Sequence, residues 1–152
     1  MRELPRQLTA GELGELFEGR TRLVEQLAKI EDPLGQAEAV LRGLSEEQQV
    51  EALSAHPAIG ARSGLSARSA AEQGTDASPA ILSELAYLNQ VYEEKFGFRF
   101  VVFVNRRPKA EILEVLRDRL ARTRAEELET GVRELVEIAR SRWEEHRWMR
   151  TT

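Results

Sequence analysis

Apolar residues recur at helical spacing along most of this chain, and several of these runs follow a signal that starts a helix. Three signals are capping boxes, in which Ser or Thr stands three residues before Glu or Gln: Thr9 with Glu12, Ser45 with Gln48, and Thr123 with Glu126. A fourth is Ser78-Pro79, because serine caps a helix and proline suits its first position. Apolar spacing of three and four residues predicts helices that bury one face. The chain is therefore expected to fold mainly as amphipathic helices.

Proline residues set several of the remaining boundaries. A helix through Leu23 and Ile30 is expected to end before Asp32-Pro33. The helix that opens at Ser45 should stop near Ala55, since the residue before Pro57 is steered out of the helical region. Pro108 is expected to start a further helix.

The segment FGFRFVVFV, residues 96–104, is the one run with the aromatic and β-branched composition of a strand. The sequence shows no partner strand for it, so its backbone polar groups must meet helices or be exposed to something else, such as a ligand. We therefore expect an all-α fold. It would be a compact, single-domain bundle over residues 1–152, with about seven to nine helices and one extended apolar segment near 98–104.

Composition excludes several classes of protein. Hydrophobic residues make up 41% and charged residues 32% of the chain, which is the balance of a globular protein, and no apolar run is long enough for a membrane span. The N-terminus lacks the features of a secretory signal peptide, which favours a cytoplasmic protein. With no cysteine and two histidines, disulfides, thiolate sites and histidine-rich metal sites are excluded. The formal net charge of −4 argues against a broad nucleic-acid surface.

Residues 58–77 form a long, small and polar stretch, and loops of this length inside compact domains are more often functional than idle. Ser69 and Glu72 match a capping box, but Gly74 leaves little room for a helix. The alternative is a polar cluster of Ser69, Glu72 and Gln73 that holds a polar ring through hydroxyl, carboxylate and amide groups. The residues alone leave both interpretations open.

Two polar residues continue apolar helix faces. His56 follows Leu53 by three residues, and it is either a half-buried residue that caps the last carbonyls or a positioned acid or base. Arg142 extends the stripe that includes Ile138, so its guanidinium either meets an anion or carbonyls inside the protein or reaches water along an apolar surface. Arg140 lies on the polar side of the same helix and is expected to be solvated.

Several ordered blocks along the chain form a family pattern. They are His56-Pro57, Ser69-x-x-Glu72-Gln73, Lys95-Phe96-Gly97-Phe98 followed by an apolar run, Arg119-Leu120 and Ile138-x-x-x-Arg142. In order and spacing the chain resembles the decarboxylases of 2-oxo-4-hydroxy-4-carboxy-5-ureidoimidazoline (OHCU), which finish urate oxidation to (S)-allantoin. The resemblance implies an all-helical carboxy-lyase that is commonly dimeric, acts on a small molecule and needs no metal or organic cofactor.

The resemblance also implies roles for individual residues. His56 would be the catalytic acid and base, and Glu72 and Arg142 would complete the active centre. The substrate pocket would be lined by Pro57, by Ser69, Ala70, Ala71, Glu72 and Gln73, and by the main chain of Phe100, Val101, Val102, Phe103 and Val104. The sequence does not indicate which group delivers the last proton to the product.

The chain departs from the family pattern at three places. Arg99 stands where proline is frequent, Phe103 where a small residue or cysteine is frequent, and Arg20-Thr21-Arg22 where Ser-Pro-Trp is common shortly after a Phe-Glu pair that this chain keeps as Phe17-Glu18. Two alternatives to the family reaction remain. One is a lyase for a related heterocyclic acid, and the other is a helical interaction module that has lost the chemistry.

Overall fold

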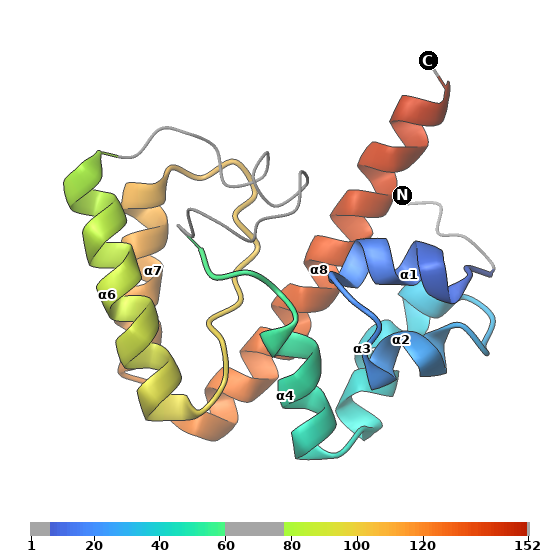
Figure 1. Cartoon of the computed structure of the whole chain (residues 1–152), viewed down its shortest axis with the longest axis horizontal. Helices are drawn as coiled ribbons and strands as arrows, with labels where there is room; N and C mark the ends of the chain where they lie inside the picture. The colour runs from blue at the N-terminus through green and yellow to red at the C-terminus, as the bar shows by residue number, and fades with distance from the viewer. Residues whose placement is uncertain (1–6, 60–77, 152) are drawn as a thin grey trace.

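The computed structural model describes residues 7–59 and 78–151, and within these ranges it contains seven helices and no strand (Figure 1). Their bounds are α1 Ala10–Phe17, α2 Arg22–Leu27, α3 Pro33–Gly43, α4 Glu46–Ser54, α6 Pro79–Phe96, α7 Lys109–Leu120 and α8 Arg124–Thr151. The all-α prediction is confirmed. None of the helices in these ranges has both the length and the apolar character that crossing a membrane needs.

Most helix ends lie where the capping residues and prolines of the sequence predict them. Thr9 and Ser45 each form a complete capping box, and Ser78 caps α6 with proline in its first turn. The second helix is shorter than predicted, because α2 ends at Leu27 rather than near Ile30. After Leu27 the backbone tightens: the N–H of Ile30 donates to the carbonyl of Leu27, three residues back, instead of continuing the α-helical pattern.

The helices form two groups joined by α8. Helices α1, α3 and α4 each pack against α8, and α2 contacts α1, α3 and α4. Helices α6 and α7 pack against each other, and they run in the same direction because the segment between them returns along their length (Figure 1). A parallel pair of helices needs such a long return, and the apolar segment 98–104 provides it.

This returning segment is extended but pairs with no strand in the described ranges, and it lies in the core. Phe98, Phe100, Val101, Val102 and Val104 are buried, and the two phenylalanine rings pack against Tyr92 of α6. Phe103 is half-buried. The segment therefore contributes apolar side chains to the core much as a helix face does.

Side chains bind much of the polar backbone of the extended segment. Arg119 donates to the carbonyl of Val101 at 2.9 Å, and Arg107 donates to the carbonyls of Phe103 at 2.6 Å and Val104 at 3.1 Å. The N–H of Phe103 donates to Glu134 at 3.3 Å. These long polar side chains do what a neighbouring strand would otherwise do.

Arg119 belongs to a buried network around Glu127, which has no exposed surface. The carboxylate of Glu127 accepts from Tyr92 at 2.6 Å, Arg119 at 2.7 Å and Arg122 at 2.9 Å. Burial, followed by the hydrogen bond to Glu127, raises the pKa of Tyr92 above its usual range. The network links α6, α7 and α8, and through Arg119 it holds the extended segment in place.

Arg140 differs from its prediction. Instead of being solvated, it is partly buried and donates to the carbonyls of Leu34 at 2.9 Å and Gly35 at 3.4 Å. The packing of α3 on α8 brings these carbonyls within reach of Arg140. The apolar spacing of α8 alone does not predict this contact.

Candidate active site

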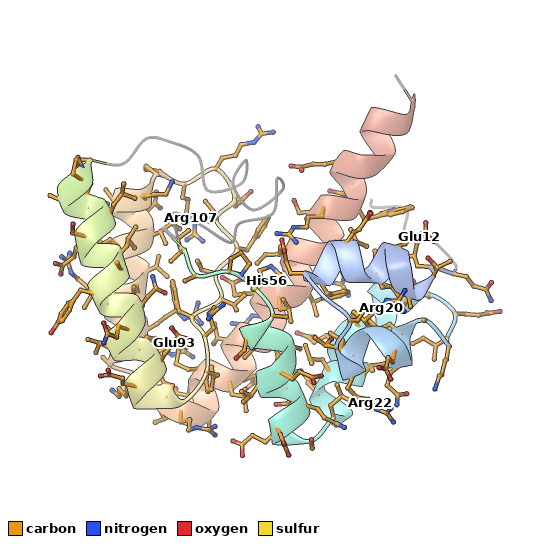
Figure 2. All side chains as sticks on the ribbon, viewed as in Figure 1. Glu12, Arg20, Arg22, His56, Glu93 and Arg107 are labelled. Atoms are coloured by element: carbon orange, nitrogen blue, oxygen red, sulfur yellow. The ribbon has the colours of Figure 1, made fainter. Side chains whose placement is uncertain are left out.

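His56 lies two residues beyond the end of α4, near the middle of the molecule (Figure 2). Its backbone N–H donates to the carbonyl of Leu53 at 3.2 Å, which completes the last turn. The side chain is only 6% exposed, and neither ring nitrogen has a hydrogen-bond partner among the described residues. The interpretation of the imidazole as a cap for helix carbonyls is therefore wrong, and within the described part of the chain both nitrogens of the buried ring are without a partner.

The surroundings of the ring keep it neutral. Burial is the largest influence and lowers the pKa of His56 to about 3, with help from the positive charges of Arg142 and Arg99 and against the opposing charge of Glu18. At neutral pH the imidazole therefore has one nitrogen that can donate a hydrogen bond and one that can accept one.

Arg142 points into the protein, as one of the two alternatives for it predicted. Its side chain is 1% exposed, and Nη1 lies 3.0 Å from the Glu18 carboxylate and donates to the carbonyl of Leu16 at 3.1 Å. The alternative in which the guanidinium reaches water is wrong. A cation this deeply buried needs an anion beside it, and Glu18 supplies one.

Glu18 is a residue of the site that the sequence interpretation did not single out. It follows α1 directly in a left-handed conformation, with φ of 65°, and its side chain is 12% exposed. Inward-facing Arg142 signalled that an anion was needed, but 26 acidic residues were available to provide it. The Phe17-Glu18 pair that the chain shares with the family pattern was the one signal that distinguished Glu18.

The structure brings together part of the predicted site. Arg142 acts on the His56 ring through its charge, and Pro57 follows His56 and is half-buried. Ser69, Ala70, Ala71, Glu72 and Gln73 lie outside the described residues. The main chain of Phe100–Val104 is held by the polar side chains described above, and Arg99 just before it contacts the backbone of His56.

The other departures from the family pattern have local roles. Thr21 caps α2 by accepting from the N–H of Val24, and the N–H of Arg22 donates to Glu51 of α4 at 2.7 Å. Figure 2 shows Arg20 and Arg22 on the α1–α4 side of the molecule. The segment Arg20-Thr21-Arg22 therefore caps the start of α2 and hydrogen-bonds it to α4.

The described ranges contain no group of three or more His, Asp or Glu residues arranged to hold a metal ion.

The low pKa of His56 predicts acid sensitivity of the fold. As the pH falls below 6.5, the usual value for histidine, the unfolded chain binds a proton at His56 and the folded protein does not. The contribution of this group is complete above pH 6.5, and below it the free energy of unfolding falls by about 1.4 kcal/mol per pH unit until the pH reaches about 3. Urea unfolding of wild type and His56→Asn at pH 7, 6, 5 and 4 measures this slope. The free energy of unfolding of wild type should fall more steeply than that of His56→Asn as the pH falls from 6.5 towards 4, and parallel curves would contradict the assignment of a neutral buried ring.

The fold is all-α, and His56 with the Arg142–Glu18 pair forms its candidate active site. The chain belongs to the OHCU decarboxylase family, whose model matches residues 2–144, and it is accordingly a carboxy-lyase.

Known proteins similar to this chain agree with the family. It is 35% identical over 119 residues to a 2-oxo-4-hydroxy-4-carboxy-5-ureidoimidazoline decarboxylase from Halalkalicoccus jeotgali, across 75% of this chain and 68% of that protein. It is 37% identical over 102 residues to the uric acid degradation bifunctional protein TTL of Arabidopsis thaliana, across 61% of this chain but 32% of that longer protein. A crystal structure of OHCU decarboxylase in the presence of (S)-allantoin superposes with a TM-score of 0.72 at 26% identity, covering 86% of this chain and 94% of that one.

Proposed function

We propose that this chain catalyses the decarboxylation of OHCU to (S)-allantoin in urate degradation, with no metal or organic cofactor. The observation that carries the proposal is the buried, neutral His56, whose two ring nitrogens have no partner among the described residues, beside the Arg142–Glu18 pair. Buried polar atoms are normally hydrogen-bonded, so two imidazole nitrogens with no partner among the described residues are suited to binding a ligand.

The reaction suits these residues. The carbon of OHCU that loses CO2 carries a hydroxyl, and the neighbouring ring carbon is doubly bonded to nitrogen. When the bond to the carboxylate breaks, its electron pair moves into the ring and the nitrogen accepts it. The nitrogen takes up a proton from solvent, the hydroxyl loses its proton to become the carbonyl of allantoin, and the neighbouring carbon gains a proton on one face. One proton in all thereby replaces the departing CO2. The protein must remove one proton and direct another, which is general acid and base work.

His56 is proposed to take the hydroxyl proton. Burial, with the charges of Arg142 and Arg99, lowers the pKa of His56 and makes it a weak base in the free protein, and an anionic substrate beside it opposes these influences. Because a nearby negative charge favours the protonated imidazole, substrate binding raises the pKa of His56 when a base is needed. Arg142 is proposed to contact an anionic or carbonyl group of the substrate.

The remaining assignments follow from the family. Glu72 is proposed to act with His56 in handling the hydroxyl proton. Pro57, Ser69 to Gln73 and the main chain of Phe100 to Val104 are proposed to line the substrate pocket. A homodimer and a cytoplasmic location are proposed on the same basis.

The function is tested by generating OHCU in situ from urate and following the formation of optically active allantoin. Wild-type protein should form (S)-allantoin faster than spontaneous decay, and heat-denatured protein should not. A wild-type rate equal to that of spontaneous decay would overturn the proposal and favour a helical module without this chemistry. Acceleration with a related heterocyclic acid but not with OHCU would assign a different substrate.

A further inference from the structure

The side chain of Arg99 connects α6 with the chain around His56. Its Nη1 donates to the carbonyl of His56 at 2.5 Å and to that of Ser54 at 3.4 Å, and its Nε lies 3.4 Å from the carboxylate of Glu93 on α6. Figure 2 labels Glu93 and His56, the two ends of this connection. We call the group formed by Glu93, Arg99 and these two carbonyls the Arg99 clamp.

The clamp acts where α4 ends. The last carbonyls of a helix have no partner within the helix, and they form the negative end of its dipole. Arg99 supplies both a donor and a positive charge to this end, at Ser54 and at His56. A carbonyl is attached directly to the Cα atom of its own residue, so holding the carbonyl of His56 restricts where its ring can lie.

A second tether holds the chain on the other side of His56. Asn89 of α6 donates to the carbonyl of Ile59 at 3.1 Å, and Ile59 itself is buried. The segment from Ser54 to Ile59 is therefore fixed at both ends by side chains that α6 supports, and the ring of Pro57 restricts the backbone between them.

The imidazole itself receives no such support in the described part of the chain. Because neither ring nitrogen is hydrogen-bonded there, the position of the ring depends on packing and on its own backbone. Catalysis is sensitive to such placement, since an error of about 1 Å in a reacting group can lower a rate about 100-fold.

We propose that Arg99 is a positioning residue for His56, which it holds by binding the carbonyls of Ser54 and His56. The Glu93 carboxylate, 3.4 Å from Nε and not hydrogen-bonded to it, provides the opposite charge. The role in catalysis rests on the proposed function, whereas the contact between Arg99 and the His56 segment does not. Arg99 also adds positive charge near the ring, together with Arg142 of α8 and against Glu18 at the end of α1.

Three variants separate the parts of the clamp. Arg99→Gln removes the positive charge and the guanidinium donors. We expect kcat to fall about 10- to 100-fold. KM should change less than about threefold, because Arg99 contacts backbone rather than substrate. Arg99→Lys keeps the charge and one donor and should recover part of the loss. Glu93→Gln leaves Arg99 on the carbonyls without its ion pair, and its loss should be smaller than that of Arg99→Gln.

Arg124→Gln is the matched control. Arg124 also donates to a carbonyl at a helix end, that of Phe96 at 2.8 Å, and also pairs with a glutamate, Glu46. It does not contact the His56 segment in the described structure, so its kcat should stay within about twofold of wild type even if its melting temperature falls.

Two measurements distinguish positioning from a merely structural role. The first is the acidic limb of the pH profile of kcat/KM, which should move to higher pH in Arg99→Gln and stay in place in Arg99→Lys, because only the former removes a positive charge near the ring. The second is the NMR signal of the His56 ring in the free protein, which should shift or broaden in Arg99→Gln and not in Arg124→Gln.

The NMR comparison needs no substrate, so it tests the clamp even if the protein proves inactive on OHCU. An unchanged ring signal in Arg99→Gln would overturn the proposal. So would a wild-type kcat and pH profile in a folded Arg99→Gln protein, including one with a lowered melting temperature.

Discussion

Replacing His56 by asparagine should lower kcat/KM for OHCU decarboxylation by about 100- to 10,000-fold, the range that a positioned acid or base contributes. The ring is buried and neutral, and asparagine keeps one donor and one acceptor in a similar space but cannot take up a proton at working pH. The measurement is the initial rate of (S)-allantoin formation, corrected for spontaneous decay of the substrate.

The same substitution should leave the fold intact at neutral pH. No described residue donates to or accepts from the His56 ring, so asparagine leaves none of them without a partner. Circular dichroism and the melting temperature check this. His146, the other histidine of the chain, provides the matched control, and His146→Gln should keep the wild-type rate. A His56→Asn protein that keeps its rate within about threefold would refute the assigned mechanism while leaving the family membership untouched.

The sequence predicted the helices well because their signals are local. The capping boxes at Thr9 and Ser45 each need only two residues three apart, and both form as predicted. The wrong end predicted for α2 also has a local cause. The apolar spacing continues to Ile30, but the backbone forms a tighter turn after Leu27. Apolar period alone does not distinguish the last helical turn from a tighter one.

The site was predicted less completely because its contacts join distant parts of the chain. Periodicity indicated that Arg142 faces inward, but it could not identify Glu18 as the anion or Leu16 as the carbonyl that it meets. Arg99 was noted as a departure from the family pattern, yet nothing nearby in the sequence indicates that it reaches back to His56. Such partners depend on how the helices pack against one another, and the apolar spacing within a single helix does not predict that packing.

Replacing Arg142 by methionine should lower the free energy of unfolding by about 3 to 5 kcal/mol, the usual cost of removing one member of a buried ion pair. Methionine fills much of the space but leaves Glu18, itself 12% exposed, and the carbonyl of Leu16 with one partner fewer. The value is measured by urea unfolding at pH 7. If Arg142 also contacts the substrate, kcat/KM should fall about 100- to 1,000-fold, as for the loss of one donor to a developing charge.

Arg140 offers the matched control on the same helix. It donates to the carbonyls of Leu34 and Gly35 and pairs with Glu137, but it is 23% exposed, so Arg140→Met should cost about 1 kcal/mol. The double variant Glu18→Gln with Arg142→Met separates the pair from its surroundings. Because glutamine is uncharged, the double variant should be more stable than the sum of the two single losses predicts, by about 0.5 to 3 kcal/mol. Strictly additive losses would show that Glu18 and Arg142 do not depend on each other, and the ion pair would then not explain why the arginine is buried.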